Sequence, residues 1–121
     1  MIYHGTRFTM KSGTTPEQLE YALEGLREQG RSIPAVVSFV VGRDYDSEYE
    51  WGAVFVLRDL AGYWEYLVHP AHLKTDRAGL PLVDKFMSFD ITDDDDPELG
   101  ARIAELHQRR YSGGRVRPPL P

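Results

Sequence analysis

The chain has 121 residues, of which 41% are hydrophobic and 27% are charged, as in one soluble globular domain. Its net charge of −5 argues against a surface that binds nucleic acid or an anionic membrane, because both need a basic patch. The lack of cysteine excludes disulfides, thiolate catalysis and thiolate metal sites. Neither a signal peptide nor an apolar run of the ~18 residues that span a membrane is visible, so a cytoplasmic protein is expected.

Residues 2–10 are predicted to form a strand, because their side chains alternate in character with a period of two. One face of this strand carries Ile2, His4, Thr6, Phe8 and Met10. His4 and Phe8 are therefore expected to point together toward the core or a pocket.

A helix is predicted to follow a turn at residues 11–14. Thr15 is its expected N-cap, with Pro16 at the first helical position and Gln18 placed to close a capping box. Leucines at i, i+4 and i+7 give it one apolar stripe, made of Leu19, Leu23 and Leu26. Gly30 is the expected C-cap, and Pro34 prevents the helix from continuing.

Residues 35–41 and 51–57 are predicted to be strands that are buried on both faces, because polar residues almost disappear from them. In the first of the two, we assign Val37, Phe39 and Val41 to one face and Val36 and Val40 to the other.

A second amphipathic helix is predicted after Asp59, which is a good N-cap, and its apolar side includes Trp64. Pro70 interrupts this helix and should bend the chain, and a short helix is expected from Ala71 to about Gly79. A fourth strand is predicted over residues 85–92.

Four consecutive aspartates occupy residues 93–96 and can be read either as a solvated loop or as a divalent-cation site. Asp96 is also a possible N-cap of a last helix over residues 97–110. The chain is thus expected to divide into a domain over residues 1–92, an acidic linker and C-terminal helix over 93–111, and a disordered or partner-wrapping tail over 112–121.

The order strand, helix, strand, strand, helix, strand predicts an α+β fold of the ferredoxin-like, split β-α-β-β-α-β type. Two helices cover only one face of its four-stranded antiparallel sheet, although the central strands are apolar on both. We expect the same face of a second copy to cover the other, in a homodimer that stacks sheet on sheet. The alternative is that the C-terminal helix folds back over it.

Several short segments resemble the stress-responsive A/B barrel family of dimeric α/β barrels. The segments are His4, Ile33-Pro34, Val41-Gly42-Arg43-Asp44, Tyr66-Leu67-Val68-His69-Pro70-Ala71-His72 and Phe89-Asp90. The resemblance implies a homodimer whose two sheets close into a barrel. The family includes stress-responsive proteins without a settled reaction, and enzymes that act on small molecules without cofactors, namely a polyketide cyclase that makes olivetolic acid and a hydroxynitrile lyase.

In that cyclase, a histidine on the first strand and the second histidine of the His-Pro-x-His segment perform the acid–base chemistry. The resemblance places these roles on His4 and His72 and makes Tyr66 a pocket residue. A further pocket tyrosine of the cyclase has no counterpart, since Leu26 falls at about its position.

The residues also give His72 a chemical argument of their own, because a histidine of near-neutral pKa can remove a proton next to a carbonyl group. The alternative is a structural His72 whose ring bonds to the backbone at the bend. His69 is expected to cap the helix end, with a pocket role as the alternative, and Trp64 is either core or part of the substrate surface. His107 is expected at the surface. No metal site is expected, because Pro70 distorts the spacing of the histidine pair.

The sequence and the resemblance together predict a cofactor-free acid–base enzyme that acts on a small, largely apolar carbonyl compound, in the manner of a polyketide cyclase or a lyase. His72 and His4 would be catalytic, and Tyr66, His69, Trp64 and Phe8 would contact the substrate. The alternative is a homodimer that binds a small molecule, or responds to stress, without catalysis.

Overall fold

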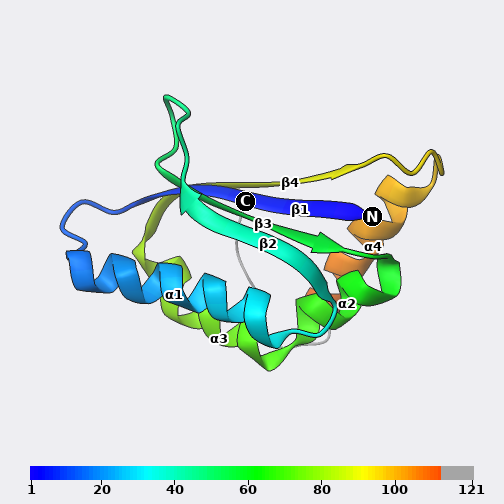
Figure 1. Cartoon of the computed structure of the whole chain (residues 1–121), viewed down its shortest axis with the longest axis horizontal. Helices are drawn as coiled ribbons and strands as arrows, with labels where there is room; N and C mark the ends of the chain where they lie inside the picture. Colours follow the sequence, from blue (N-terminus) through cyan, green and yellow to red (C-terminus); the bar gives the residue numbers. More distant parts are fainter. Residues whose placement is uncertain (113–121) are drawn as a thin grey trace.

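A computed structural model describes residues 1–112 and shows an antiparallel four-stranded sheet with the helices on one of its faces (Figure 1). The elements are β1 (Ile2–Met10), α1 (Pro16–Ser32), β2 (Val36–Arg43), β3 (Trp51–Leu57), α2 (Leu60–Val68), α3 (Pro70–Gly79), the 3-10 turn η1 (Leu80–Leu82), β4 (Val83–Thr92) and α4 (Leu99–Ser112). The strand order β2-β3-β1-β4 confirms the predicted ferredoxin-like fold. No helix within the described part of the chain is both long and apolar enough to cross a membrane.

Helix α1 starts as predicted but ends later. The Gln18 N–H donates to Thr15 Oγ1 (3.1 Å) and the Thr15 N–H donates to Gln18 Oε1 (2.9 Å), which completes the capping box. The predicted C-cap at Gly30 is wrong, because the helix continues to Ser32. Gly30 instead allows close packing on β2, since a Cβ atom there would lie 2.3 Å from the ring of Phe39.

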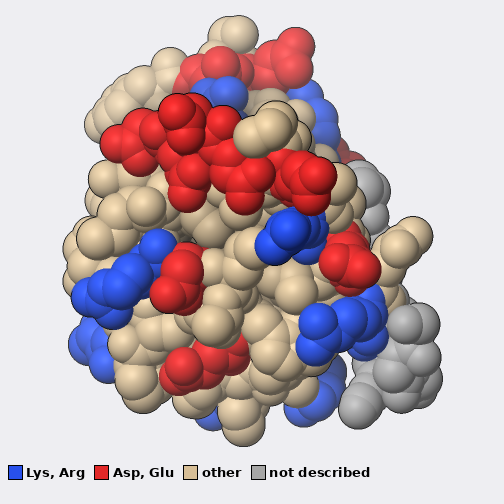
Figure 2. Space-filling model, turned by 90° about the vertical axis from the view of Figure 1, so that its right-hand side faces the viewer, with Lys and Arg blue, Asp and Glu red and all other residues tan. Residues whose placement is uncertain are grey.

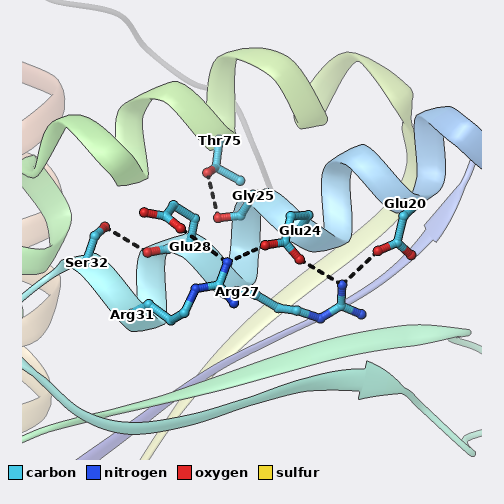
Figure 3. A network of polar contacts seen from close by, with 8 residues as sticks. All are labelled: Glu20, Glu24, Gly25, Arg27, Glu28, Arg31, Ser32 and Thr75. Atoms are coloured by element: carbon cyan, nitrogen blue, oxygen red, sulfur yellow. Dashed lines mark hydrogen bonds and ion pairs between the residues drawn. The ribbon is translucent and has the colours of Figure 1, made fainter.

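The exposed side of α1 carries alternating charges (Figure 3). Arg27 bonds to Glu20 and Glu24, and Arg31 bonds to Glu24 and Glu28. These ion pairs are exposed to solvent, so they add little to stability.

Helix α3 runs antiparallel to α1 beneath the sheet (Figure 1). The Thr75 hydroxyl of α3 donates to the Gly25 carbonyl of α1 (3.2 Å), a contact drawn in Figure 3. This bond fixes how the two helices are aligned along their length.

Strand β2 is irregular at its start, and the predicted faces of its first residues are wrong. The pairing with β3 shifts between Val36 and Ser38, so one extra residue of β2 lies opposite β3. Val36 therefore packs against the core with Phe39, whereas Val37 is exposed.

The face of the sheet opposite the helices has a large apolar area. Tyr3, Val40 and Ile91 are 43%, 61% and 61% exposed there. Helix α4 does not cover this face, because its apolar stripe of Leu99, Ile103 and Leu106 joins the core on the helix side. Within the described residues, the C-terminal helix therefore does not fold back over this face, which was the alternative to a homodimer.

The acidic run at residues 93–96 forms an exposed loop, at the end of the molecule where Figure 2 shows a band of acidic side chains. Asp94 Oδ1 accepts from the Asp96 N–H and Asp96 Oδ1 accepts from the Glu98 N–H (both 2.9 Å). Helix α4 begins at Leu99, so Asp96 caps a turn and not the predicted helix start. Across residues 1–112, no cluster of three or more His, Asp or Glu side chains could hold a metal ion.

Candidate active site

The junction of α2 and α3 carries most of the predicted site. Asp59 caps α2 by accepting from the Gly62 N–H (2.8 Å), and α2 ends at Val68. His69 is both the C-cap of α2 and the N-cap of α3, and its Nδ1 accepts from the Ala71 N–H (3.0 Å). The bend expected at Pro70 is thus held by His69, and it turns His72 inward.

A cavity of about 320 Å³ lies between the sheet and helices α1, α3 and α4. Much of its wall is apolar and includes Phe8, Met10, Leu26, Phe55, Leu80 and Phe86. A smaller polar part includes His4, Tyr66, His72, Asp76, His107 and Arg110. A cavity with apolar walls and a few polar groups suits a small organic ligand.

His72 is buried, with 7% of its surface exposed. Its Nδ1 lies 3.1 Å from the Leu67 carbonyl oxygen, which can only accept, so Nδ1 carries the proton and Nε2 holds the lone pair. Burial lowers the pKa of His72 to about 4, with a minor contribution from the positive charge of Arg110, so the ring is neutral at pH 7. Its Nε2 is therefore in the form that can accept a proton. The Leu67 bond is also the backbone contact that a structural histidine would make.

Asp76 lies beside the proton-accepting nitrogen. His72 Nε2 is 3.6 Å from Asp76 Oδ1, and Arg110 Nη2 donates to Asp76 Oδ2 (2.7 Å). A carboxylate in this position can stabilise the imidazolium that forms when His72 takes up a proton. The i, i+4 spacing of His72 and Asp76 on α3 could have revealed this pair in the sequence, but nothing in the sequence connects Asp76 with Arg110.

His4 belongs to a second polar group beside the cavity. Its Nδ1 donates to Asp90 Oδ1 (2.9 Å), on the residue directly opposite in β4. The Tyr63 hydroxyl, fully buried on α2, also donates to Asp90 Oδ1 (2.9 Å). Burial opposes the ionisation of Asp90, but the hydrogen bonds from His4 and Tyr63 outweigh it and hold its pKa below the usual range. An ionised Asp90 thus orients His4 by its Nδ1.

His107 completes this group, which corrects its predicted position at the surface. It is half-buried on α4, lines the cavity, and its Nε2 lies 3.1 Å from the Tyr63 hydroxyl. Burial lowers its pKa, and the neighbouring His4 adds to this effect. The sequence analysis also missed Tyr63 and Asp90 as site residues. The only sequence signal for Tyr63 is its position three residues before Tyr66, on the same side of α2.

The structure brings four of the six predicted site residues together at the cavity. His4, Phe8, Tyr66 and His72 all line it. The Tyr66 ring stacks on His72 with centroids 4.5 Å apart and makes a T-shaped contact with the His4 ring, with centroids 5.6 Å apart. Burial raises the pKa of Tyr66, so its hydroxyl remains a hydrogen-bond donor.

Trp64 and His69 are not among the residues that line the cavity. Trp64 packs against the hydrophobic core, with the Arg109 guanidinium 4.3 Å from its ring centroid. His69 has the helix-end position that the sequence indicated.

Comparisons with known proteins show what this chain is similar to. The family model of the stress responsive A/B barrel domain matches residues 2–93. A hydroxynitrile lyase from Passiflora edulis has a TM-score of 0.70 at 12% identity, covering 78% of this chain and 94% of the lyase. A dimeric ferredoxin-like protein from Thermobifida fusca has a TM-score of 0.68 at 22% identity, covering 75% of this chain and 89% of that protein. SnoaB, a cofactor-independent oxygenase from Streptomyces nogalater, has a TM-score of 0.62 at 19% identity, covering 79% of this chain and 95% of the oxygenase. A search of curated proteins finds no match.

Proposed function

Since the chain belongs to the stress responsive A/B barrel domain family, we propose that its cavity is the active site of an acid–base enzyme for small, largely apolar carbonyl compounds. The strongest support is the state of His72, which is buried, neutral at pH 7 and fixed with Nε2 as its proton-accepting nitrogen. Two enzymes of the same fold, the lyase and the cofactor-independent oxygenase, are consistent with a catalytic role.

The reaction would begin with removal of a proton from a carbon next to the carbonyl group. His72 Nε2 would accept the proton, and Asp76 would stabilise the resulting imidazolium. The electron pair would move to the carbonyl oxygen, where the Tyr66 hydroxyl would donate a hydrogen bond to the enolate. A proton on Nε2 of His4, whose Nδ1 bonds to Asp90, would make it a second donor. The enolate could then attack a second carbonyl group, whose oxygen would take the proton back from His72, as in a cyclase. In a lyase, its electron pair would instead expel a leaving group from the β carbon, and that group would take the proton.

A non-catalytic, ligand-binding homodimer is the second candidate. It is favoured by the hydrogen bond between His72 Nδ1 and Leu67, which joins the two ends of the α2–α3 bend and would suffice to retain a histidine there. Such a protein would bind carbonyl compounds in the cavity without exchanging their protons.

The two candidates are separated by the exchange of methyl protons of acetophenone in D₂O, followed by NMR. We expect catalysed exchange that is constant from about pH 8 to 5 and falls as the pH drops through about 4, because protonated His72 cannot accept a proton. Circular dichroism at each pH verifies that the protein stays folded. A midpoint near 6.5, the ordinary value for histidine, would contradict the assignment of the base to buried His72, and binding without exchange would favour the second candidate.

We also propose that the exposed apolar face of the sheet forms a homodimer, which agrees with the dimeric ferredoxin-like relative from Thermobifida fusca. Light scattering at micromolar concentration should give twice the chain mass of 13.8 kDa. The double substitution Val40→Glu and Ile91→Glu should give monomers, because it buries four like charges in a two-fold interface. Tyr21→Glu is the control, since Tyr21 is 63% exposed on α1, on the other side of the sheet. A monomeric wild type, or a double variant that remains dimeric, would contradict the proposed interface.

A further inference from the structure

Gln29 of α1 has a buried side-chain oxygen without a hydrogen-bond partner. Only 1% of the residue is exposed, and its Oε1 is the one buried side-chain oxygen or nitrogen among the described residues that lacks a partner. Its backbone carbonyl is satisfied, because it accepts from the Ile33 N–H (3.2 Å). A buried amide without partners destabilises a fold, so its presence calls for a physical reason.

The Gln29 side chain lines the same cavity as His4, Tyr66 and His72. The Thr75–Gly25 hydrogen bond sets the alignment of α1 and α3, which run antiparallel (Figure 1). Gln29 lies one turn beyond Gly25, so it is level with the turn of α3 that precedes Thr75 and carries His72. The unpaired amide and the candidate base therefore lie at the same end of the two helices.

The surroundings of Gln29 on α1 offer no polar partner. The other α1 residues that line the cavity are Ala22 and Leu26, and Phe55 lines the cavity from the sheet. A wholly apolar ligand would leave the amide unpaired. A ligand hydroxyl can accept from the amide N–H and donate to the amide oxygen, so it matches both of its polar groups.

We propose that Gln29 binds a hydroxyl group of the ligand, and that the compound bound in the cavity is a hydroxylated, otherwise apolar ketone or aldehyde. This inference rests on the proposed function, since it places the reacting carbonyl beside His72 and Tyr66. Gln29 would orient the compound through this second polar group and would distinguish it from analogues that lack the hydroxyl.

The test measures dissociation constants by NMR titration for acetophenone and for the three isomers of hydroxyacetophenone that carry the hydroxyl on the ring. Wild type should bind at least one isomer several-fold to about tenfold more tightly than acetophenone, as one buried hydrogen-bonded pair allows. The substitution Gln29→Leu, which removes the amide at similar size, should abolish this preference and retain acetophenone binding. Gln108→Leu, the same change at an exposed position of α4 that does not line the cavity, is the control and should retain the preference.

The melting temperature without ligand gives a second, independent result. The Gln29→Leu variant should melt at or above the wild-type temperature, because the buried amide oxygen that it removes has no partner in the fold. A Gln29→Leu variant that melts several degrees lower, or that still prefers the hydroxylated isomer, would overturn the inference. A wild type that binds all four compounds equally would also overturn it.

These experiments show separately whether the proposed role of Gln29 fails and whether the proposed function fails. Catalysed methyl exchange together with an unchanged preference in the Gln29→Leu variant would overturn the role of Gln29 alone. A wild type that binds none of the four compounds would overturn both proposals.

Discussion

Replacing His72 with asparagine is expected to lower the rate of catalysed proton exchange by about 10²–10⁴-fold, the usual contribution of a general base. Asparagine places an amide N–H near the position of Nδ1, so it can keep the hydrogen bond to the Leu67 carbonyl. It has no group that can accept a proton at neutral pH. The measurement is methyl exchange in acetophenone at pH 7, with protein concentration matched to the wild type.

The same variant is also expected to change how stability depends on pH. In wild type, His72 has a pKa of about 4 when folded and an ordinary value of 6.5 when unfolded, so the unfolded state binds more protons between these values. The free energy of unfolding should therefore fall by about 3 kcal/mol as the pH drops from 6.5 to 4, and this part of the loss should be missing in the variant. A variant that retains full exchange would show that His72 is not the base. One that loses its fold at pH 7 would show that the histidine is structural.

Replacing Gly30 with alanine is expected to lower the free energy of unfolding by about 1–3 kcal/mol, although alanine is the better helix former by about 1 kcal/mol. The added Cβ atom would overlap the Phe39 ring, with ring atoms at 2.3 Å, and α1 and β2 would have to move apart. Urea denaturation of both proteins measures the difference.

Gly100→Ala is the matched control for this substitution. Gly100 is also helical, in α4, but nothing lies within 4 Å of the position of its Cβ atom. The control should therefore be as stable as wild type or slightly more so. If Gly30→Ala were equally harmless, the close packing of α1 on β2 would not depend on glycine.

The amino-acid pattern was sufficient to predict the fold and the position of His4 and His72 at one cavity, because both depend on local rules. Alternation in β1 placed His4 on the inner face, and the proline after α2 placed His72 beyond a bend. The partners of these histidines depend on tertiary structure. Asp90 lies opposite His4 only through the β1–β4 register, 86 residues apart in sequence.

Other parts of the structure could not be predicted for related reasons. The side of the sheet on which α4 packs decides whether His107 faces solvent or Tyr63, and an apolar stripe alone does not specify that side. The reversed faces of Val36 and Val37 result from one extra residue in β2, which strict alternation cannot show. The unpaired side-chain oxygen of Gln29 can be recognised only when all its surroundings are known.

Helix α4 lies beyond residue 93, where the match to the family model ends, yet it supplies His107 and Arg110 to the cavity. A fragment cut to the family's boundaries would keep both catalytic candidates. It would lose the cation that pairs with Asp76 and the imidazole that bonds to Tyr63. Assays on such a fragment would describe a different cavity, so tests of the proposed activity require the chain with α4 intact. The same arrangement lets substitutions in one C-terminal helix change the wall of the cavity while residues 2–93 stay unchanged.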